Sequence, residues 1–471
     1  MRAPRVGILT FSDGRRHVHE ELLPLTRRFQ DRLAARLRGR GWEVTTGREI
    51  VWTTDLAARE GRYLAAQGVE ATIFNYAIWA WPHYSAIAAQ FVPGPILLFS
   101  NINPQYPGLV AMLAAAGSLD QIGAFHGRAS GDIDDPAVLD RLLRFLRPAA
   151  ARNRLRGEVY GVIGGRSMGM YTAVPSLDQW RRDFGIDIEH IDQFEIVRRA
   201  EAIPDARADA GIAWLQAHGA TIHYDGKKLT PLLLRRQLKA YHAMREIIDE
   251  WRLDFCGIKG QPEMTDHFAT MDVAEAFLND PYDWEGPHDP IVCATEADSD
   301  GALTMEIFKH IARTPVLFAD VRHYDAGADT WDLVNSGEHA TYFAGRSFDP
   351  AVNLRHVHLY PAILYFPAGG ASVMHIAAPG EVTLARLARR NGRYWMAIVP
   401  GEFLEFPPEV AAQKARATTP EWPHAFARFR VPAEEFLGEY DSNHIHGVYG
   451  DYVDDLVWFC RMTGIEPRVF R

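Results

Sequence analysis

The sequence predicts an α/β protein with two doubly wound α/β N-terminal domains and a C-terminal β-rich domain, either a small barrel or an antiparallel sheet. Through the first two thirds of the chain, short apolar runs alternate with helix-like amphipathic segments, which is the pattern of βαβ units on a parallel sheet. From about Pro315 the segments become short, β-rich and divided by Gly and Pro, which is typical of antiparallel sheets and small barrels. A length of 471 residues also exceeds what one hydrophobic core usually holds.

The predicted domains are 1–156, 157–314 and 315–471. We interpret the basic, alanine-rich run at 147–154 as the linker that ends the first domain. After it a strand pattern begins again at Val159, so the second domain repeats the α/β alternation of the first.

In the first domain, five-to-six-residue apolar runs predict buried strands, and longer segments with helical periodicity predict helices. The predicted elements are a strand at Val6–Phe11, a helix at Glu20–Arg40, a strand at Ala71–Asn75, a helix at Tyr84–Gln90, a strand at Ile96–Ser100, and helices at Leu109–Ala116 and Pro136–Leu146.

In the second domain the same periodicities predict a strand, a glycine-rich turn and several helices. The elements are a strand at Val159–Ile163, a turn at 164–169, segments at Leu177–Phe184 and Ile196–Ala202, helices at Ala206–His218 and Leu232–Trp251, a strand at Asp254–Lys259 and a helix at Leu303–Ile311. The turn lacks the Lys-Ser/Thr ending of a nucleotide-binding loop, so a phosphate-binding loop is disfavoured.

In the third domain we predict short strands and one closing helix. The strands are Thr314–Phe318, Val352–Tyr360, Val382–Arg389, Tyr394–Glu402 and Ala427–Arg430, and the helix is Asp451–Thr463.

The composition indicates a soluble protein that handles a neutral or metal-chelated ligand. Fifty Lys and Arg against sixty Asp and Glu give a net charge of −10, which argues against nucleic-acid binding. The three cysteines (Cys256, Cys293, Cys460) are isolated in sequence, which favours a reducing compartment. The start of the chain is not a signal peptide, and no apolar run is long enough to span a membrane, so we expect a cytoplasmic location without membrane partners.

Glu296 is the first candidate functional residue. It follows the apolar run Pro290–Thr295, at the strand end where α/β sheets bind their ligands. The next polar residues, Asp298 and Ser299, precede a helix, so one of those two can cap it. Glu296 is then left for metal binding or catalysis, although a purely structural role is equally open.

Asp320 and His444 complete a candidate metal site. Asp320 also follows a short apolar run, where a carboxylate is costly to bury without a partner; a pairing with Arg322 is the structural alternative. His444 lies in the His-x-His segment with His446, a weak ligand signal that is often only a surface pair. Two carboxylates and a neutral imidazole suit one divalent cation.

Arginines and tryptophans are the other candidates. Arg15 or Arg16, after the first strand, could bind a polyol hydroxyl or a carboxylate, or could form only a surface pair in a turn. Trp79, Trp81 and Trp422 could stack on a sugar face, although core packing is the commoner role of a tryptophan.

Together these segments resemble the L-fucose isomerase family, which is related to the L-arabinose isomerases. The resemblance covers most of the chain and rests on short motifs in a matching order. The motifs are Val6-Gly7-Ile8 with Asp13-Gly14-Arg15-Arg16, Gly164-Gly165-Arg166-Ser167-Met168-Gly169, Gly260-Gln261-Pro262-Glu263-Met264-Thr265-Asp266, Ala294-Thr295-Glu296-Ala297-Asp298-Ser299, Phe318-Ala319-Asp320-Val321-Arg322, Val334-Asn335-Ser336-Gly337, Glu421-Trp422-Pro423 and Asn443-His444. The chain is shorter than the long enzymes of the family.

The resemblance implies a metal-dependent aldose–ketose isomerase. Glu296, Asp320 and His444 would hold Mn²⁺, with Co²⁺ or Mg²⁺ also suited to these ligands. Glu296 and Asp320 would be the acid/base pair of an ene-diol mechanism on a pentose or 6-deoxyhexose resembling L-fucose or D-arabinose. The residues that would bind substrate are Arg16, Trp79, Gln261, Trp422 and Asn443. The resemblance further implies a cytoplasmic homo-oligomer, a hexamer or a trimer-based assembly.

Two alternatives belong to other functional classes. The paired α/β lobes also suit a non-catalytic sugar-binding protein, which would purify without stoichiometric metal. The second alternative is a metal-dependent epimerase or aldolase on the same scaffold, because the fold and the metal do not determine which reaction is catalysed.

Overall fold

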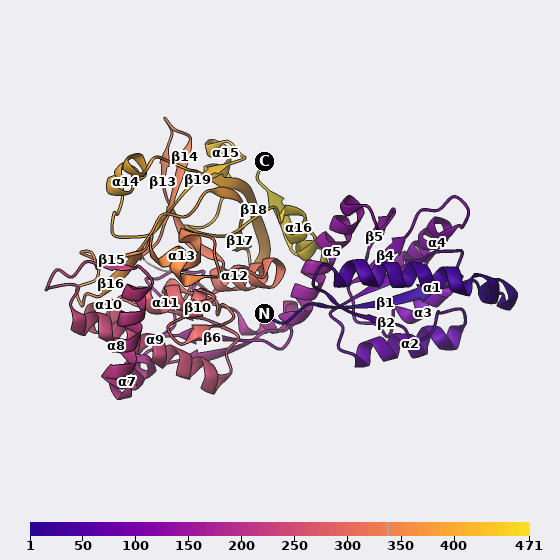
Figure 1. Cartoon of the computed structure of the whole chain (residues 1–471), viewed down its shortest axis with the longest axis horizontal. Coiled ribbons are helices and arrows are strands. Elements are labelled where there is room, and N and C mark those ends of the chain that lie inside the picture. The colour runs from indigo at the N-terminus through magenta and orange to yellow at the C-terminus, as the bar shows by residue number, and fades with distance from the viewer. Residues whose placement is uncertain (337–338) are drawn as a thin grey trace. The chain divides into compact units, whose positions relative to one another are not determined.

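The computed structural model describes residues 1–336 and 339–471, so Gly337 of the Val334–Gly337 motif lies outside the described residues (Figure 1). The chain divides into two compact units. Unit 1 is Met1–Arg154 with Asp454–Gly464, and unit 2 is Leu155–Val453 with Ile465–Arg471. The predicted fold class is confirmed, because two parallel sheets precede a β-rich C-terminal part. The division at 1–156, 157–314 and 315–471 stays a prediction.

Unit 1 contains a parallel sheet with the strand order β2-β1-β3-β4-β5. Its elements are β1 (Arg5–Phe11), α1 (Arg16–Arg38), β2 (Glu43–Thr46), α2 (Thr54–Ala66), β3 (Ala71–Tyr76), α3 (Pro82–Ala88), β4 (Ile96–Ser100), α4 (Gly108–Gln121), β5 (His126–Ser130), α5 (Pro136–Arg154) and α16 (Val453–Thr463). Alternate residues of β1 serve two cores. Ile8 packs with α1 and α5, whereas Leu9 packs with α2 and α4.

The first half of unit 2 contains a second parallel sheet, in the order β12-β9-β6-β7, together with helices and three short strands of other sheets, β8, β10 and β11. Its elements are β6 (Val159–Ile163), α6 (Leu177–Asp183), β7 (Asp187–Ile191), α7 (Phe194–Ala202), α8 (Asp205–Ala217), β8 (Thr221–Ile222), α9 (Pro231–Trp251), β9 (Phe255–Ile258), α10 (Glu263–His267), α11 (Asp272–Asn279), β10 (Tyr282–Asp283), β11 (Gly286–Pro287), β12 (Cys293–Ala294), η1 (Thr295–Ala297) and α12 (Ser299–Ala312).

The C-terminal part of unit 2 contains a closed barrel. Within the described residues, β17, β20, β13, β14, β19 and β18 form an antiparallel ring that β17 and β18 close, and β21 joins β18 in parallel. The elements are β13 (Leu317–Asp325), β14 (Thr330–Val334), η2 (Thr341–Ala344), α13 (Pro350–Leu354), β15 (His358–Pro361), β16 (Ala371–Met374), β17 (Gly380–Arg390), β18 (Arg393–Phe403), α14 (Pro408–Ala417), β19 (His424–Phe429), α15 (Ala433–Glu439), β20 (His444–Tyr449) and β21 (Glu466–Val469). Closure removes the exposed sheet edges that a short open sheet would leave.

Two predicted elements were wrong. The proposed linker at 147–154 is the last part of α5, where Pro148 is buried inside the helix. The strand predicted at Val352–Tyr360 begins with α13 instead, because Asp349 caps a helix that has Pro350 in its first turn. The polar strands β2, β5 and β7 lack a long apolar run and were missed for that reason.

No helix within 1–336 and 339–471 has the length and apolar character needed to cross a membrane.

Candidate functional site

Glu296 lies in a strained turn at the end of a strand of the second parallel sheet. Strand β12 ends at Ala294, η1 follows, and α12 begins at Ser299. Glu296 has φ 57° and Ala297 has φ 48°, so two successive residues with side chains occupy the left-handed region. Such backbone costs about 1–3 kcal/mol per residue and persists where the surroundings enforce it, often at active sites.

Barrel pairing brings Asp320 and His444 together. The two residues lie opposite each other in the antiparallel pair β13–β20, so their side chains share one face. His444 Nε2 lies 3.2 Å from Asp320 Oδ1 and 3.3 Å from Glu296 Oε2. His444 is fully buried, and its Nε2 makes no hydrogen bond to any described residue. The predicted trio therefore converges on one buried nitrogen.

Asp298 fixes the other side of the His444 ring. Its carboxylate lies 2.7 Å from His444 Nδ1 and also accepts a hydrogen bond from the backbone N–H of Gly301, so it caps α12. This confirms that one of the two predicted residues is the cap, and it is Asp298 rather than Ser299. A hydrogen bond to Nδ1 sets the tautomer and orientation of a ligating imidazole.

Arg386 neutralises Asp298. The Arg386 guanidinium donates to both carboxylate oxygens of Asp298, at 2.5 and 2.9 Å, and both side chains are fully buried. Burial alone would favour the protonated acid, but Arg386 and His444 hold the pKa of Asp298 well below its usual range.

The site carries excess negative charge that attracts a cation. Glu296, Asp320 and Asp298 surround His444, while Arg386 supplies one positive charge. Burial favours the uncharged imidazole, yet these carboxylates raise the pKa of His444 well above its ordinary value. The arrangement therefore stabilises positive charge at Nε2, either as a proton or as a bound metal ion.

His446 does not join the ligand set. The Nη1 atom of Arg386 lies 2.9 Å from His446 Nε2, and the centroids of the His446 and Phe318 rings are 4.7 Å apart. Burial and the nearby guanidinium hold the pKa of His446 well below its ordinary value. His446 therefore packs beside Arg386 as a neutral side chain.

A cavity of about 180 Å³ opens beside the two carboxylates. Its lining residues are Gln261, Glu296, Asp320, Arg322, Asn335, Ser336, Tyr365, Phe366 and Trp422. This is below the ~300–1,000 Å³ of drug-sized sites, so it suits a ligand as small as one monosaccharide. Gln261 donates to Glu296 Oε1 at 3.3 Å, and Asn443 donates to Asp320 Oδ1 at 3.4 Å.

The predicted substrate-binding residues fall in both units. Gln261 and Trp422 line the cavity and Asn443 contacts Asp320, all in unit 2. Arg16 and Trp79 belong to unit 1. There Arg16 pairs with Glu20 at 3.8 Å on the surface, and Trp79 is half-buried against the apolar core.

Arg322 does not pair with Asp320, which the sequence had left open. Its guanidinium lies over the Trp422 ring, 5.4 Å from the centroid, and donates to Thr419.

Sequence reasoning missed Arg386 entirely and gave Asp298 only a capping role. The available signal was an arginine inside the otherwise apolar stretch Leu384–Ala388. A charged residue there needs a buried partner.

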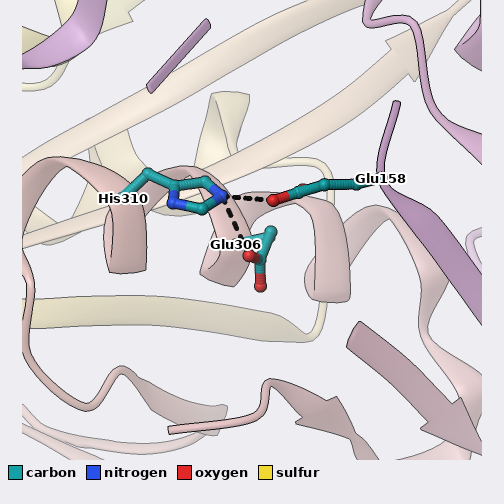
Figure 2. Close-up of side chains that lie close together, drawn as sticks. All are labelled: Glu158, Glu306 and His310. Carbon is teal, nitrogen blue, oxygen red and sulfur yellow. Dashed lines mark hydrogen bonds and ion pairs between the residues drawn. The ribbon is translucent and has the colours of Figure 1, made fainter. Parts of the chain in front are cut away.

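A second acidic cluster lies where β6 begins beside α12. Figure 2 shows Glu158, Glu306 and His310, whose ligand atoms all lie within 4.8 Å of one another, so this group could hold a metal ion. Among the described residues the predicted trio does not form so tight a group. Here, however, His310 Nε2 lies 2.7 Å from Glu158 and 3.0 Å from Glu306, and Lys309 lies 2.6 Å from Glu306. Two cations thus already balance two carboxylates.

This cluster should make stability depend on pH. Burial opposes the charge on His310, but Glu158 and Glu306 raise its pKa to about 9, above the ~6.5 expected when unfolded. The charged His310 therefore stabilises the folded state, and this stabilisation is complete below about pH 6.5. As pH rises through about 9 it is lost, which lowers the free energy of unfolding by on the order of 3 kcal/mol. Denaturant unfolding between pH 6 and 10 measures it. His310→Gln should remove this pH dependence, and an equally steep decline in that variant would contradict the assignment.

The chain is similar to known proteins along nearly its whole length. Three sequence models match: the first N-terminal domain of L-fucose isomerase at residues 3–157, the second N-terminal domain at 236–313 and the C-terminal domain at 333–469. L-fucose isomerase from Streptococcus pneumoniae strain CGSP14 is 25% identical over 558 aligned positions, covering 99% of this chain and 93% of the relative. The same enzyme from strain D39 is 24% identical with the same coverage. A periplasmic solute-binding protein from Actinobacillus succinogenes with bound D-allose is 10% identical, covers 66% of this chain and 92% of its own, and has a TM-score of 0.17, too low to support a conclusion.

Proposed function

Because the chain belongs to the L-fucose isomerase family, it is an aldose–ketose isomerase, and we propose that it uses one divalent cation to convert a pentose or 6-deoxyhexose. The proposed substrates resemble L-fucose, which the names of the relatives mention, or the pentose D-arabinose, which has the same configuration at C2–C4. The observation that carries the proposal is the buried His444 Nε2, which faces Glu296 and Asp320 without a hydrogen bond to any described residue.

We place the cation at Glu296, Asp320 and His444. Two carboxylates and one imidazole are a donor set for Mn²⁺, Co²⁺ or Mg²⁺, and the local charge favours a cation. When bound, the metal would polarise the substrate carbonyl as a Lewis acid. We prefer this trio to the tighter Glu158 cluster because Glu296 and Asp320 line the cavity, whereas Glu158 and Glu306 do not and Glu306 is already paired with Lys309.

The protein's own groups supply the proton transfers. We propose that Glu296 removes the proton from C2 of the open-chain aldose and that Asp320 returns a proton at C1, through an ene-diol. The hydroxyl proton moves from O2 to O1. Asp320 takes its proton from solvent and Glu296 releases the C2 proton to solvent, so both carboxyl groups return to their starting states and the isomerisation balances. Gln261 would hold Glu296 through its hydrogen bond while Asp298 and Arg386 keep His444 in place.

Metal removal tests this proposal. The assay follows ketose formation from L-fucose, D-arabinose and L-arabinose, before and after EDTA and after Mn²⁺ is added back. We expect activity to fall at least about 100-fold with EDTA and to return with Mn²⁺, because the metal supplies several kcal/mol of charge stabilisation.

Metal content of two histidine variants locates the ion. His444→Ala should lose bound Mn²⁺, whereas His310→Gln should keep it at one ion per chain. The opposite result would move the metal to Glu158 and Glu306. Undiminished activity in metal-free protein would refute metal dependence, and sugar binding without turnover would favour a binding protein.

We also propose that the enzyme is a cytoplasmic homo-oligomer, a hexamer or a trimer-based assembly. The three cysteines are buried and isolated in sequence, without a Cys-x-x-Cys motif, which supports a reducing compartment. The family membership supports the assembly, and light scattering of the purified protein measures its mass.

A further inference from the structure

One loop places an exposed tyrosine at the mouth of the cavity. The loop between β15 and β16 contains Tyr365, which lines the cavity although 66% of the residue is exposed. Its neighbour Leu364 is 85% exposed and does not line the cavity. The next residue, Phe366, is buried. Tyr365 thus extends from an anchored base toward the space that a bound sugar would occupy.

The base of this loop is held by several contacts. The backbone N–H of Ala362 donates to the Gly370 carbonyl, and the ammonium of Lys228 donates to the carbonyls of Phe366 and Pro367. Phe366 stacks on Trp422 with ring centroids 6.1 Å apart. These contacts fix the loop backbone on both sides of Tyr365, so its ring is presented from a defined position.

The cavity lining contains polar side chains, which include Arg322, Asn335 and Ser336, and a smaller aromatic group. Glu296, Asp320 and Gln261 form a hydrogen-bonding group that suits the oxygens at the reacting end of a sugar. Tyr365, Phe366 and Trp422 form an aromatic group. Aromatic rings pack against the C–H groups of a sugar and against a methyl group, and they give no compensating contact to a hydroxyl that they desolvate.

We propose that Tyr365 determines specificity by packing against the apolar C5–C6 end of a 6-deoxyhexose, so that the enzyme favours a substrate with a C6 methyl over the corresponding pentose. This inference rests on the proposed function, since it assumes that the reacting end of the sugar lies at Glu296 and Asp320. The ring would act by contact, and the phenol hydroxyl is not required.

A pair of unreactive ligands separates this inference from catalysis. L-fucitol and D-arabinitol have no carbonyl, share the configuration at C2–C4, and differ by the C6 methyl. Their affinities for the Mn²⁺-loaded protein can be measured by calorimetry. One apolar group in a pocket changes specificity by about 10- to 200-fold. We expect Tyr365→Ala to weaken L-fucitol binding about 10-fold and D-arabinitol binding less than about 3-fold.

Two control variants keep the test specific. Tyr365→Phe should retain the preference for L-fucitol because the ring remains. Leu364→Ala removes an adjacent exposed apolar side chain that is outside the cavity, and it should change neither affinity. Because Tyr365 is largely exposed, its replacement should leave the melting temperature within a few degrees of the wild type.

The outcomes distinguish the two proposals. Equal weakening of both alditols in Tyr365→Ala, no weakening of either, or no binding of either to the wild type overturns the role of Tyr365. If the wild type binds L-fucitol but forms no ketose, the proposed function is refuted. In that case a preference for the methyl-bearing alditol that is lost in Tyr365→Ala would still support the role of Tyr365. In the active enzyme, Tyr365→Ala should lower kcat/KM about 10-fold for L-fucose and less than about 3-fold for D-arabinose.

Discussion

Glu296→Gln should reduce isomerisation by about 10²–10⁴-fold or more, because it removes both a proton-transfer group and a proposed metal ligand. The amide keeps the size of the side chain and its contact with Gln261, which now lies 3.3 Å from the carboxylate. It cannot accept the proton from C2, and it weakens the attraction for a cation beside His444. Initial rates of ketose formation at saturating Mn²⁺ measure the effect.

Glu409→Gln is the matched control for that variant. It makes the same chemical change at an exposed position in the first turn of α14, away from the cavity residues. We expect wild-type kcat and KM. Isomerase activity of Glu296→Gln close to that of the control would rule out Glu296 as the acid/base group. Proton exchange at C2 with solvent deuterium, measured in both variants, would show whether proton abstraction is the step that is lost.

Arg386→Met should destabilise the fold by about 3–5 kcal/mol, because it leaves the buried Asp298 carboxylate without its bidentate partner. Methionine retains much of the apolar stem, so the loss reflects charge and hydrogen bonding more than volume. The free energy of unfolding from denaturant titration of the unliganded protein measures this cost. The orientation of His444 depends on Asp298, so Mn²⁺ affinity should also fall, by about 10–100-fold.

Arg430→Met provides the comparison for Arg386. Arg430 pairs with Glu381 on the surface, where the side chains are 59% and 50% exposed. Exposed pairs contribute about 0–1 kcal/mol, so this variant should unfold nearly as the wild type does. Similar losses in the two variants would mean that the Arg386–Asp298 pair contributes no more than a surface contact. The double variant Arg386→Met/Asp298→Asn should recover part of the stability, since it removes both buried charges.

Much of the architecture was predictable because local periodicity encodes it. The strands at Val6–Phe11, Ala71–Asn75 and Ile96–Ser100 were predicted from apolar runs and are confirmed as β1, β3 and β4. Burial on both faces of a parallel sheet makes such runs nearly continuous in sequence. The polar strand β5 and the helical residues 147–154 were not recognised, because neighbouring elements decide their conformation.

The candidate site divides in the same way. Glu296 and Asp320 were proposed because each carboxylate follows an apolar run, and His444 because its imidazole could complete the set; these are properties of short segments. Only the tertiary structure decided that Asp320 lies opposite His444, because barrel closure sets the register of β13 and β20. It also decided that Arg386 faces Asp298, and that Asp298 contacts His444 across 146 residues of chain. Sequence spacing determines which face of its strand a residue occupies. The partner of that residue is determined by pairing between distant segments of the chain. Because the free energy of a buried charge depends on its partner, the sequence alone did not determine the energetics of the site.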